Sequence, residues 1–539
     1  MNLKSLWILV LACVATTLSA QKKPLDQSAY DGWKSIVSPK VSENGDWICY
    51  AITPQRGDAL LEFYNAGTKQ TTRIERGGSP AWFNNDTWAT FKIAVPFAKV
   101  RQAKIDKVKA DKMPKDTFAV MNLAEMKVVK LPGAKELKTS AKGALYAYTY
   151  EVTPVKDTTV KDSAAKGNKT PGKYDRLVVV DVRTGDSTVV DSVKNFTVAE
   201  NGRSVLYTRE ADSLKAVYVY TVDPKRGVLQ RELWSSKLGA VSPSLVLDRS
   251  GEQGAFLVTA DTVKHALYDL YYFSTTDLKP RQVADAQIIG LPGGYAVSRF
   301  GNLSFNHEGN RLQFGIAPKP KEVPKDTLPA DEKFSLDVWS YRDTMLMPTQ
   351  LVNKKKIEEA SYPAVYFPKE NRAVALGDKD LPSVSFAENG DAPYAIGTTR
   401  LPYSLYTEPE IQMFDPSDSY LIELKTGKRT LLRKKGYGGM YLSPSAKYAA
   451  YYNLPDSSWY SIDTKTLKHT RLTADIPYPL YNVDDDHPGA PPLYGMYGWT
   501  KGDEMMLIPD QFDLWLVDPS GKKASRNLTK IGRETNTQV

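Results

Sequence analysis

The feature that most restricts the fold is a strand and turn pattern that occurs twice in register near the C-terminus. Residues 499–529 carry a turn, two short apolar strands and a second turn, and residues 441–473 repeat that order. A tryptophan and a leucine fall at equal intervals in the two copies, Trp459 and Leu472 in one and Trp515 and Leu528 in the other. Two copies in register indicate a structural repeat.

Looser copies of the first turn occur along the rest of the chain. Gly and Asn in these turns reach positive φ at low cost, as hairpins require. The turns are Ser42–Gly45, Phe83–Asp86, Ser140–Gly143, Ala199–Gly202, Asp248–Gly251, Asn306–Gly309 and Ala387–Gly390. Each unit therefore reads as a small antiparallel meander, and the series predicts an all-β fold, a β-propeller. We expect eight blades, with seven or nine left open because residues 362–432 can be divided in two ways.

Three polar insertions interrupt the repeats. The first, residues 99–115, is rich in lysine and predicts a short helical excursion that Pro114 ends. Contact with an anionic surface is one reading of its charge, but a hydrated face is the commoner role of such runs. Residues 153–173 and 317–333 are expected to be solvated loops.

The N-terminus predicts export. Residues 1–20 contain the apolar run Leu6–Ala15 and then small residues, the pattern of a secretory signal peptide, which leaves residues 21–539 as the propeller domain. The run is about half of the ~20 residues that cross a bilayer, so no membrane span is expected. A lipoprotein site at Cys13 would leave too short an apolar core. Cys49 would then be the sole cysteine, more typical of a buried apolar position than of a nucleophile. We expect a periplasmic or extracellular protein.

Composition excludes several classes of function. Lys and Arg total 71 against 62 Asp and Glu, and an excess of +9 over this length does not indicate a nucleic-acid-binding protein. With 4 His and 2 Cys, a histidine-rich metal centre, a disulfide scaffold and an iron-sulfur cluster are all poorly supported. The sequence therefore predicts no cofactor and no metal.

Short motifs follow one another in a specific order over most of the chain. They are Leu25-Asp26, Tyr30–Lys34, Pro54–Asp58, Met113–Thr117, Pro324–Leu328, Asp337–Asp343, and a series from Tyr494 to Pro519. In this order they resemble the N-terminal propeller of the prolyl oligopeptidase family, in its secreted bacterial branch related to dipeptidyl peptidases. The resemblance implies a serine hydrolase domain of α/β type after the propeller, whose active site the propeller covers so that only peptides or short chains enter.

That chemistry needs a serine on a strand-to-helix elbow, usually Gly-x-Ser-x-Gly, followed along the chain by Asp and His. The sequence contains no Gly-x-Ser-x-Gly. The nearest approach, Gly77–Ala81, leads into blade pattern, and Pro80 suits an edge strand, so we assign no catalytic role to Ser79. Ser163–Lys166 and Lys425–Gly427 imitate two penicillin-binding-protein motifs, but the third motif, Ser-Asp-Asn, is missing.

Other polar residues are also interpreted as structural. The histidines are scattered over different repeats without ligand-like spacing, and a site requires converging partners. They are His265, His307, His469 and His487. The run Asp484–His487 offers carboxylates for a hard cation, but prolines surround it and no regularly spaced oxygen ligands follow. We therefore predict no catalytic, cofactor-binding or metal-binding residues in this chain.

One pair of glutamates is relevant to the resemblance to dipeptidyl peptidases. Dipeptidyl peptidases of the family hold the free amine of the substrate with paired glutamates on a propeller excursion. Glu358-Glu359 is the only such pair here, and it follows Lys354–Lys356. Ion pairing with these lysines on an exposed turn is the interpretation from sequence, so the amine-binding role is not transferred.

The expected function is the substrate-gating propeller of an exported serine peptidase of prolyl oligopeptidase type, not catalytically competent as this chain alone. Its expected partners are a peptide or short polypeptide substrate, if a hydrolase domain is supplied, and either a hydrolase partner or further copies of this chain, with no nucleic acid. The alternative is a free-standing, non-catalytic periplasmic or surface propeller that binds a peptide, a glycan or a protein.

Overall fold

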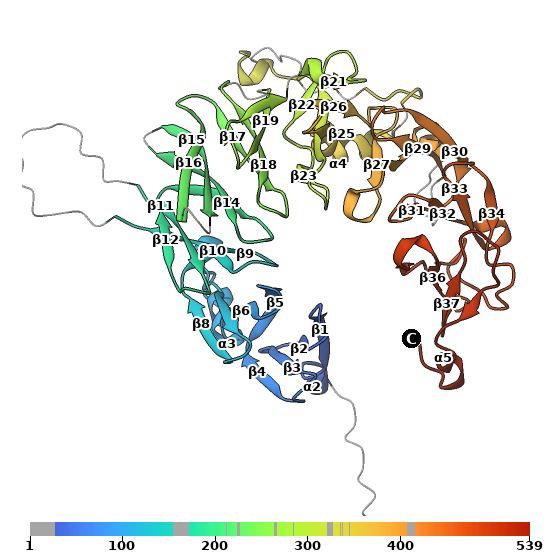
Figure 1. Ribbon diagram of the computed structural model, residues 1–539, viewed down its shortest axis with the longest axis horizontal. Helices are drawn as coiled ribbons and strands as arrows, with labels where there is room; N and C mark the ends of the chain where they lie inside the picture. The colour runs from blue at the N-terminus through green and yellow to red at the C-terminus, as the bar shows by residue number, and fades with distance from the viewer. Residues whose placement is uncertain are drawn as a thin grey trace, which may run out of the picture. The chain divides into compact units, whose positions relative to one another are not determined.

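A computed structural model describes most of the chain in two compact units (Figure 1). The described residues are 27–154, 172–211, 213–223, 227–262, 267–283, 285–320, 327–334, 336, 338–343, 345–406 and 416–538. The predicted signal peptide therefore lies outside them. The first unit ends at Leu137 and the second begins at Lys138, within strand β9 (Ala134–Thr139).

The first unit contains two four-stranded antiparallel sheets. They consist of β1 (Lys34–Val41), β2 (Trp47–Pro54), β3 (Leu60–Asn65) and β4 (Thr71–Glu75), and of β5 (Gly77–Phe83), β6 (Trp88–Ile93), β7 (Thr117–Asn122) and β8 (Lys127–Leu131). Helix α2 (Gln27–Tyr30) precedes them, and α3 (Phe97–Ile105) lies in the connection from β6 to β7. A shared core that includes Phe63 and Phe91 joins the two sheets.

The second unit continues the same pattern, with six further four-stranded antiparallel sheets. After β9, their strands are β10 (Leu145–Val152), β11 (Tyr174–Asp181), β12 (Ser187–Val190), β13 (Val193–Val198), β14 (Ser204–Ala211), β15 (Leu214–Asp223), β16 (Gly227–Ser236), β17 (Ala240–Leu247), β18 (Gln253–Thr259), β19 (Asp269–Ser274), β20 (Arg281–Val283), β27 (Ser383–Phe386), β28 (Tyr394–Thr399), β29 (Ser417–Glu423), β30 (Arg429–Gly436), β31 (Met440–Leu442), β32 (Tyr448–Asn453), β33 (Ser458–Asp463), β34 (His469–Arg471), β35 (Gly498–Trp499), β36 (Met506–Pro509), β37 (Leu514–Val517) and β38 (Arg526–Asn527). The chain then forms α5 (Ile531–Glu534).

One sheet of the second unit is larger and carries an excursion. It comprises β21 (Ile288–Ile289), β22 (Tyr295–Ser298), β23 (Ser304–Phe305), β24 (Leu312–Pro318), β25 (Tyr362–Phe367) and β26 (Arg372–Ala375), with β21 parallel to β26. Between β24 and β25 the chain leaves the sheet and forms α4 (Met347–Glu358), none of whose residues is buried. The described residues also form short 3₁₀ helices at Ala110–Lys112, Asp285–Gln287, Ala330–Glu332, Glu388–Gly390, Leu401–Tyr406, Leu454–Asp456 and Lys501–Asp503.

Consecutive sheets within each unit share apolar cores, which is the packing of propeller blades. In the second unit, for example, Ile396 and Leu421 of one sheet pack with Ala449 and Ile462 of the next. Trp459 and Leu472 pack in turn with Ile508 and Trp515 of the last sheet. A single meander could not bury both of its faces, and its neighbours cover them. The predicted fold class, an all-β propeller, is confirmed.

The first turns predicted from the sequence occupy equivalent positions in successive sheets. Each of them, together with those at 443–447 and 501–503, joins the first two consecutive strands of an antiparallel meander. Nine such sheets lie in the described residues, which is the largest of the three numbers left open by the sequence. The expected positive φ is present, as at Gly202 (φ 70°), where a Cβ would lie 2.9 Å from the Ser140 hydroxyl.

The turns also connect neighbouring sheets through polar contacts. An acidic side chain in or beside the first turn of one sheet accepts hydrogen bonds from the first turn of the sheet before it. These contacts run from the Glu43 amide to Asp86 (2.6 Å), from Asn306 Nδ2 to Asp391 (2.6 Å), and from the Ser443 hydroxyl to Asp503 (2.6 Å). The turn residues therefore have a second role beyond reversing the chain.

Two predictions outside the repeat are also settled. The basic insertion is helical, as expected, although α3 ends at Ile105, well before Pro114. Cys49 is fully buried, and burial raises the pKa of its thiol to about 12, so it is the apolar core residue that the sequence predicted. Within the described residues, no helix combines the length and apolar character that crossing a membrane would need.

Candidate functional site

Two cavities of the second unit gather side chains that could bind a ligand. The first, which we call the acidic pocket, has a volume of about 330 Å³. The residues that matter for its chemistry are Tyr268, Ser298, Arg299, Phe300, Glu358 and Glu359. They come from the connection before β19, from the end of β22 and from the end of α4.

Local structure explains why both glutamates reach the acidic pocket. Helix α4 has Pro348 in its first turn and ends at Glu358, and the Glu359 amide closes the last turn on the Lys355 carbonyl (2.9 Å). The exposed carbonyls of a helix C-terminus carry partial negative charge. The pair therefore adds two carboxylates to an end that is already electronegative.

The ion pairs that the sequence suggested between these glutamates and the preceding lysines are not formed. Glu358 is the exposed last residue of α4 and Glu359 lies in the turn that follows, and neither carboxylate forms a hydrogen bond or an ion pair with any residue in the described ranges. The sequence did not predict α4 because its apolar residues do not follow a helical period against a core, and none is buried.

Arg299 also lines the acidic pocket. Its guanidinium lies 5.5 Å from the ring centroid of Tyr268 and 4.7 Å from that of Phe300, and it donates to the Tyr268 hydroxyl (3.5 Å). Two aromatic faces restrict the side chain. The acidic pocket is thus lined by two carboxylates and by one guanidinium that two aromatic rings orient.

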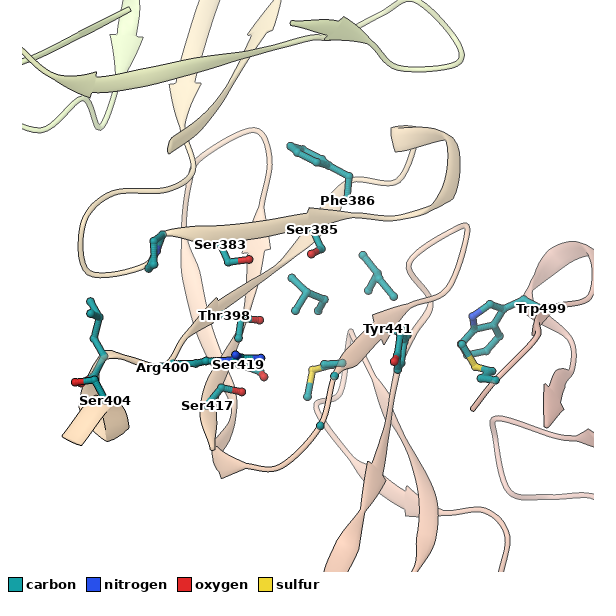
Figure 2. A pocket seen from close by; sticks show the side chains of 18 of the residues that line it. Ser383, Ser385, Phe386, Thr398, Arg400, Ser404, Ser417, Ser419, Tyr441 and Trp499 are labelled. Carbon is teal, nitrogen blue, oxygen red and sulfur yellow. The ribbon is translucent and has the colours of Figure 1, made fainter. Parts of the chain in front are cut away.

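The second cavity, which we call the inter-sheet cavity, has a volume of about 980 Å³. It opens between the sheets β27–β30 and β31–β34 and reaches β35 (Figure 2). One wall is made of hydroxyl side chains, Ser383, Ser385, Thr398, Ser417 and Ser419.

Strand register explains the hydroxyl wall. Ser383 pairs with Thr398, and Thr398 pairs with Ser419, so three hydroxyl residues form a row across adjacent strands. Adjacent strands lie about 4.8 Å apart. Ser385 lies on the same side of β27 as Ser383, and Phe386 points to the other side (Figure 2). The small side chains leave open a volume that apolar side chains fill elsewhere between these sheets.

The other wall is apolar and aromatic. Tyr441 and Trp499 face each other across one end of the inter-sheet cavity (Figure 2), and Met440 and Met496 also line the cavity. The Trp499 ring stacks on Tyr448, with ring planes 3° apart, and the Tyr441 ring packs near Trp459. Each of the two cavity-lining rings, Tyr441 and Trp499, is therefore supported by a second aromatic ring. Arg400, just after β28, lies at the end opposite Tyr441 and Trp499 (Figure 2). Among the described lining residues it is the only charged one.

Among the described residues, no serine hydroxyl forms a hydrogen bond with a histidine. Ser79 lies at a bulge in β5, and the chain continues into β6, not into a helix. Lys425–Gly427 forms the turn between β29 and β30. The Ser163–Lys166 motif lies outside the described residues.

The histidines have other partners. His307 lies 3.8 Å from Asp391, His469 Nδ1 lies 2.9 Å from the Tyr451 hydroxyl, and His487 lies 2.9 Å from Asp485. None of these three histidines has a serine hydroxyl as a hydrogen-bond partner, and His265 lies outside the described residues.

The acidic run Asp484–His487 does not converge on a point. Asp484 accepts from Gln511 Nε2 (3.0 Å), Asp485 contacts His487, and Asp486 is fully exposed. In the part of the chain that the structure covers, no three His, Cys, Asp or Glu side chains are grouped so that they could hold a metal ion.

Comparisons with known proteins give matches to solved structures only. No model of a protein family matches the sequence, and no curated protein does. The β-propeller domain of the Trilobed protease from Pyrococcus furiosus matches at 12% identity over 73% of this chain and 96% of that domain, with a TM-score of 0.31. Porphyromonas gingivalis dipeptidyl peptidase 4 matches at 11% identity over 82% of this chain and 58% of that chain, with a TM-score of 0.38.

A third solved structure matches with similarly low identity and TM-score. Pyrococcus horikoshii acylaminoacyl peptidase matches at 9% identity over 81% of this chain, with a TM-score of 0.31. This chain spans 59% of the length of that enzyme. The structures that match include peptidases of the prolyl oligopeptidase family and their propeller domains.

Proposed function

We propose that this chain is the substrate-binding propeller of an exported serine peptidase of prolyl oligopeptidase type, and that it holds the free amine of a peptide at Glu358 and Glu359. The observation that carries the proposal is the position of these carboxylates, which line the acidic pocket at the end of α4 without a partner among the described residues. Export is proposed from the apolar N-terminal segment of the sequence.

The acidic pocket suits a peptide amine for electrostatic reasons. A peptide ammonium is a compact cation with three donors, and two carboxylates together with a helix C-terminus supply acceptors and negative potential. Arg299, which lines the same pocket, would donate to a carbonyl or carboxylate oxygen of the same peptide. The volume of about 330 Å³ is at the small end for ligand sites and fits one or two residues.

The hydrolytic residues belong, in this proposal, to a hydrolase part that contacts the excursion between β24 and β25. That excursion exposes large apolar side chains, among them Phe334 (85% exposed), Trp339 (70%) and Tyr341 (87%). An apolar surface of this kind usually marks contact with another protein part. The proposal requires no catalytic nucleophile among the described residues. None of His307, His469 and His487 has a serine hydroxyl as a hydrogen-bond partner there.

Binding of matched peptides tests the amine site. We expect a short peptide with a free N-terminus to bind about tenfold more tightly than its N-acetylated form, measured by calorimetry on the mature chain. The double substitution Glu358→Gln and Glu359→Gln should abolish the difference. Glu332→Gln, an exposed glutamate on the same excursion, is the control and should preserve it. Equal binding of the two peptides by the unsubstituted chain would contradict the proposal.

Active-site labelling tests whether this chain carries the catalytic serine or depends on a separate hydrolase part. A fluorophosphonate should leave the purified chain unlabelled, because serine modification needs an activated nucleophile. Stoichiometric labelling that a peptide substrate prevents would show that the chain carries its own catalytic serine. Binding of oligosaccharides in place of peptides would support the free-standing binding module instead.

A further inference from the structure

We infer that the peptide bound at the acidic pocket carries an acidic side chain at its second or third residue, and that a neighbouring cavity binds the carboxylate of that side chain. This neighbouring cavity, which we call the basic cavity, has a volume of about 250 Å³. The inference rests on the proposed function and extends it, because it adds the class of peptide that the chain selects.

The acidic pocket and the basic cavity share two lining residues. Tyr268 and Arg299 line both of them, so the two cavities adjoin. Tyr268 is buried, and its ring centroid lies 5.5 Å from the Arg299 guanidinium. A buried ring therefore restricts the cation at the place where the cavities adjoin, and a peptide that contacts Arg299 can occupy both cavities.

Three cationic side chains line the basic cavity. Lys215 lies near the start of β15, Lys237 lies in the connection from β16 to β17, and Arg299 follows β22. None of the three forms an ion pair with another residue in the described ranges. Asp261 is the only acidic residue among the described lining residues, so three cations and one carboxylate give the basic cavity a formal charge of +2.

Charge and size together indicate a carboxylate side chain as the ligand. Ammonium and guanidinium groups that lack an acidic partner in the protein attract an anion and form charge-assisted hydrogen bonds with it. A volume of about 250 Å³ is below the usual range for a whole small-molecule ligand but is sufficient for one side chain. The side chain of Asp or Glu meets both requirements.

The order of the two cavities sets the position of the acidic residue in the peptide. Glu358 and Glu359 hold the peptide ammonium in the acidic pocket, which has room for one or two residues. The side chain that reaches the basic cavity therefore belongs to the second or third residue. A lysine or arginine at that position would meet like charge, so the basic cavity also selects against basic peptides.

Peptides that differ in two side chains test the inference. The peptides Ala-Glu-Glu-Ala, Ala-Gln-Gln-Ala and Ala-Lys-Lys-Ala are made with free N-termini and amidated C-termini, so the glutamates supply the only carboxylates. We expect the Glu peptide to bind the mature chain about tenfold more tightly than the Gln peptide, by calorimetry, and the Lys peptide to bind least tightly. Equal binding of the Glu and Gln peptides overturns the inference.

Acetylated peptides separate this test from the test of the amine site. The preference for a free N-terminus is measured with the Gln peptide, which has no carboxylate, and the preference for Glu is measured between peptides with the same N-terminus. A preference for the free N-terminus without a preference for Glu supports the amine site and overturns the inference. A preference for Glu that persists after acetylation, with no preference for the free N-terminus, contradicts the amine site and supports carboxylate binding by the basic cavity.

A double substitution locates the carboxylate site. Lys215→Gln together with Lys237→Gln should lower the preference for Glu over Gln by about fivefold or more. Lys279→Gln together with Lys468→Gln removes two exposed lysines elsewhere in the second unit, so it is matched in charge and should keep the preference. Far-ultraviolet circular dichroism confirms the folding of each variant. The inference fails if the first variant keeps the full preference, or if the control loses as much of it.

Discussion

His469 shows at the scale of one residue how partial desolvation of an exposed side chain couples stability to pH. Its Nδ1 lies 2.9 Å from the Tyr451 hydroxyl, and burial, with a smaller effect from the charge of Arg433, lowers the pKa of His469. In the unfolded chain this histidine takes up a proton as the pH falls through about 6.5, but in the folded chain it stays neutral to lower pH. The unfolded state then binds more protons, so stability is lost as the pH falls below about 6.5.

We predict that His469→Gln reduces this loss. Between pH 7.5 and pH 5.5 the free energy of unfolding in urea should fall less for the variant than for the unsubstituted chain, and the difference should be small because the His469 side chain is exposed to solvent. His487→Gln removes an exposed histidine and controls for the substitution itself. A variant with the same pH dependence as the unsubstituted chain would show that protonation of His469 is not coupled to folding.

At the scale of elements, the contacts between first turns hold neighbouring sheets together. Asp503 is buried in the turn before β36 and accepts from the Ser443 hydroxyl (2.6 Å) and from the Ser445 amide (3.2 Å), both in the preceding sheet. Hydrogen bonds to a charged group contribute more than neutral ones, and a buried partner left without one is costly. The contact therefore fixes one sheet against the next beyond the apolar packing.

We predict that Asp503→Ala lowers the free energy of unfolding by about 2 to 4 kcal/mol. Asp277→Ala, in an exposed turn where the aspartate bonds only the Lys279 amide (3.2 Å), should cost much less and is the matched control. Urea denaturation followed by tryptophan fluorescence gives both values. Equal effects of the two substitutions would mean that Asp503 only shapes its own turn.

At the scale of the whole molecule, the sheets of a unit depend on one another. Trp459 and Leu472 are buried partly by Met506, Ile508 and Trp515 of the last sheet. Each fully buried large apolar side chain contributes about 1.5 to 3 kcal/mol, so removal of a sheet costs its neighbour several such contributions.

We predict that deletion of residues 498–539 lowers the melting temperature sharply and makes the chain bind the dye anilinonaphthalene sulfonate. Replacement of residues 327–343, part of the excursion, by a short Gly-Ser linker should do neither, because the described side chains there contribute to no core. Circular dichroism melts and dye fluorescence measure both effects. An unchanged melt after the deletion would show that the sheets fold independently.

The sequence by itself determined the repeat, because alternating apolar strands and turns with positive φ are local properties. The two short strands expected within residues 499–529 are β36 and β37, and those expected within residues 441–473 are β32 and β33. Burial of Cys49 followed in the same way, from its apolar neighbours.

Only the tertiary structure decided where a ligand could bind. Glu358 and Glu359 look like partners of nearby lysines until the fold places them in one pocket with Arg299 and Phe300, which precede them by more than fifty positions in the chain. Ser383, Thr398 and Ser419 are ordinary strand residues until register aligns them into one wall. A cavity is formed by side chains from distant segments, and the volume they leave unfilled depends on packing, which local sequence pattern does not encode.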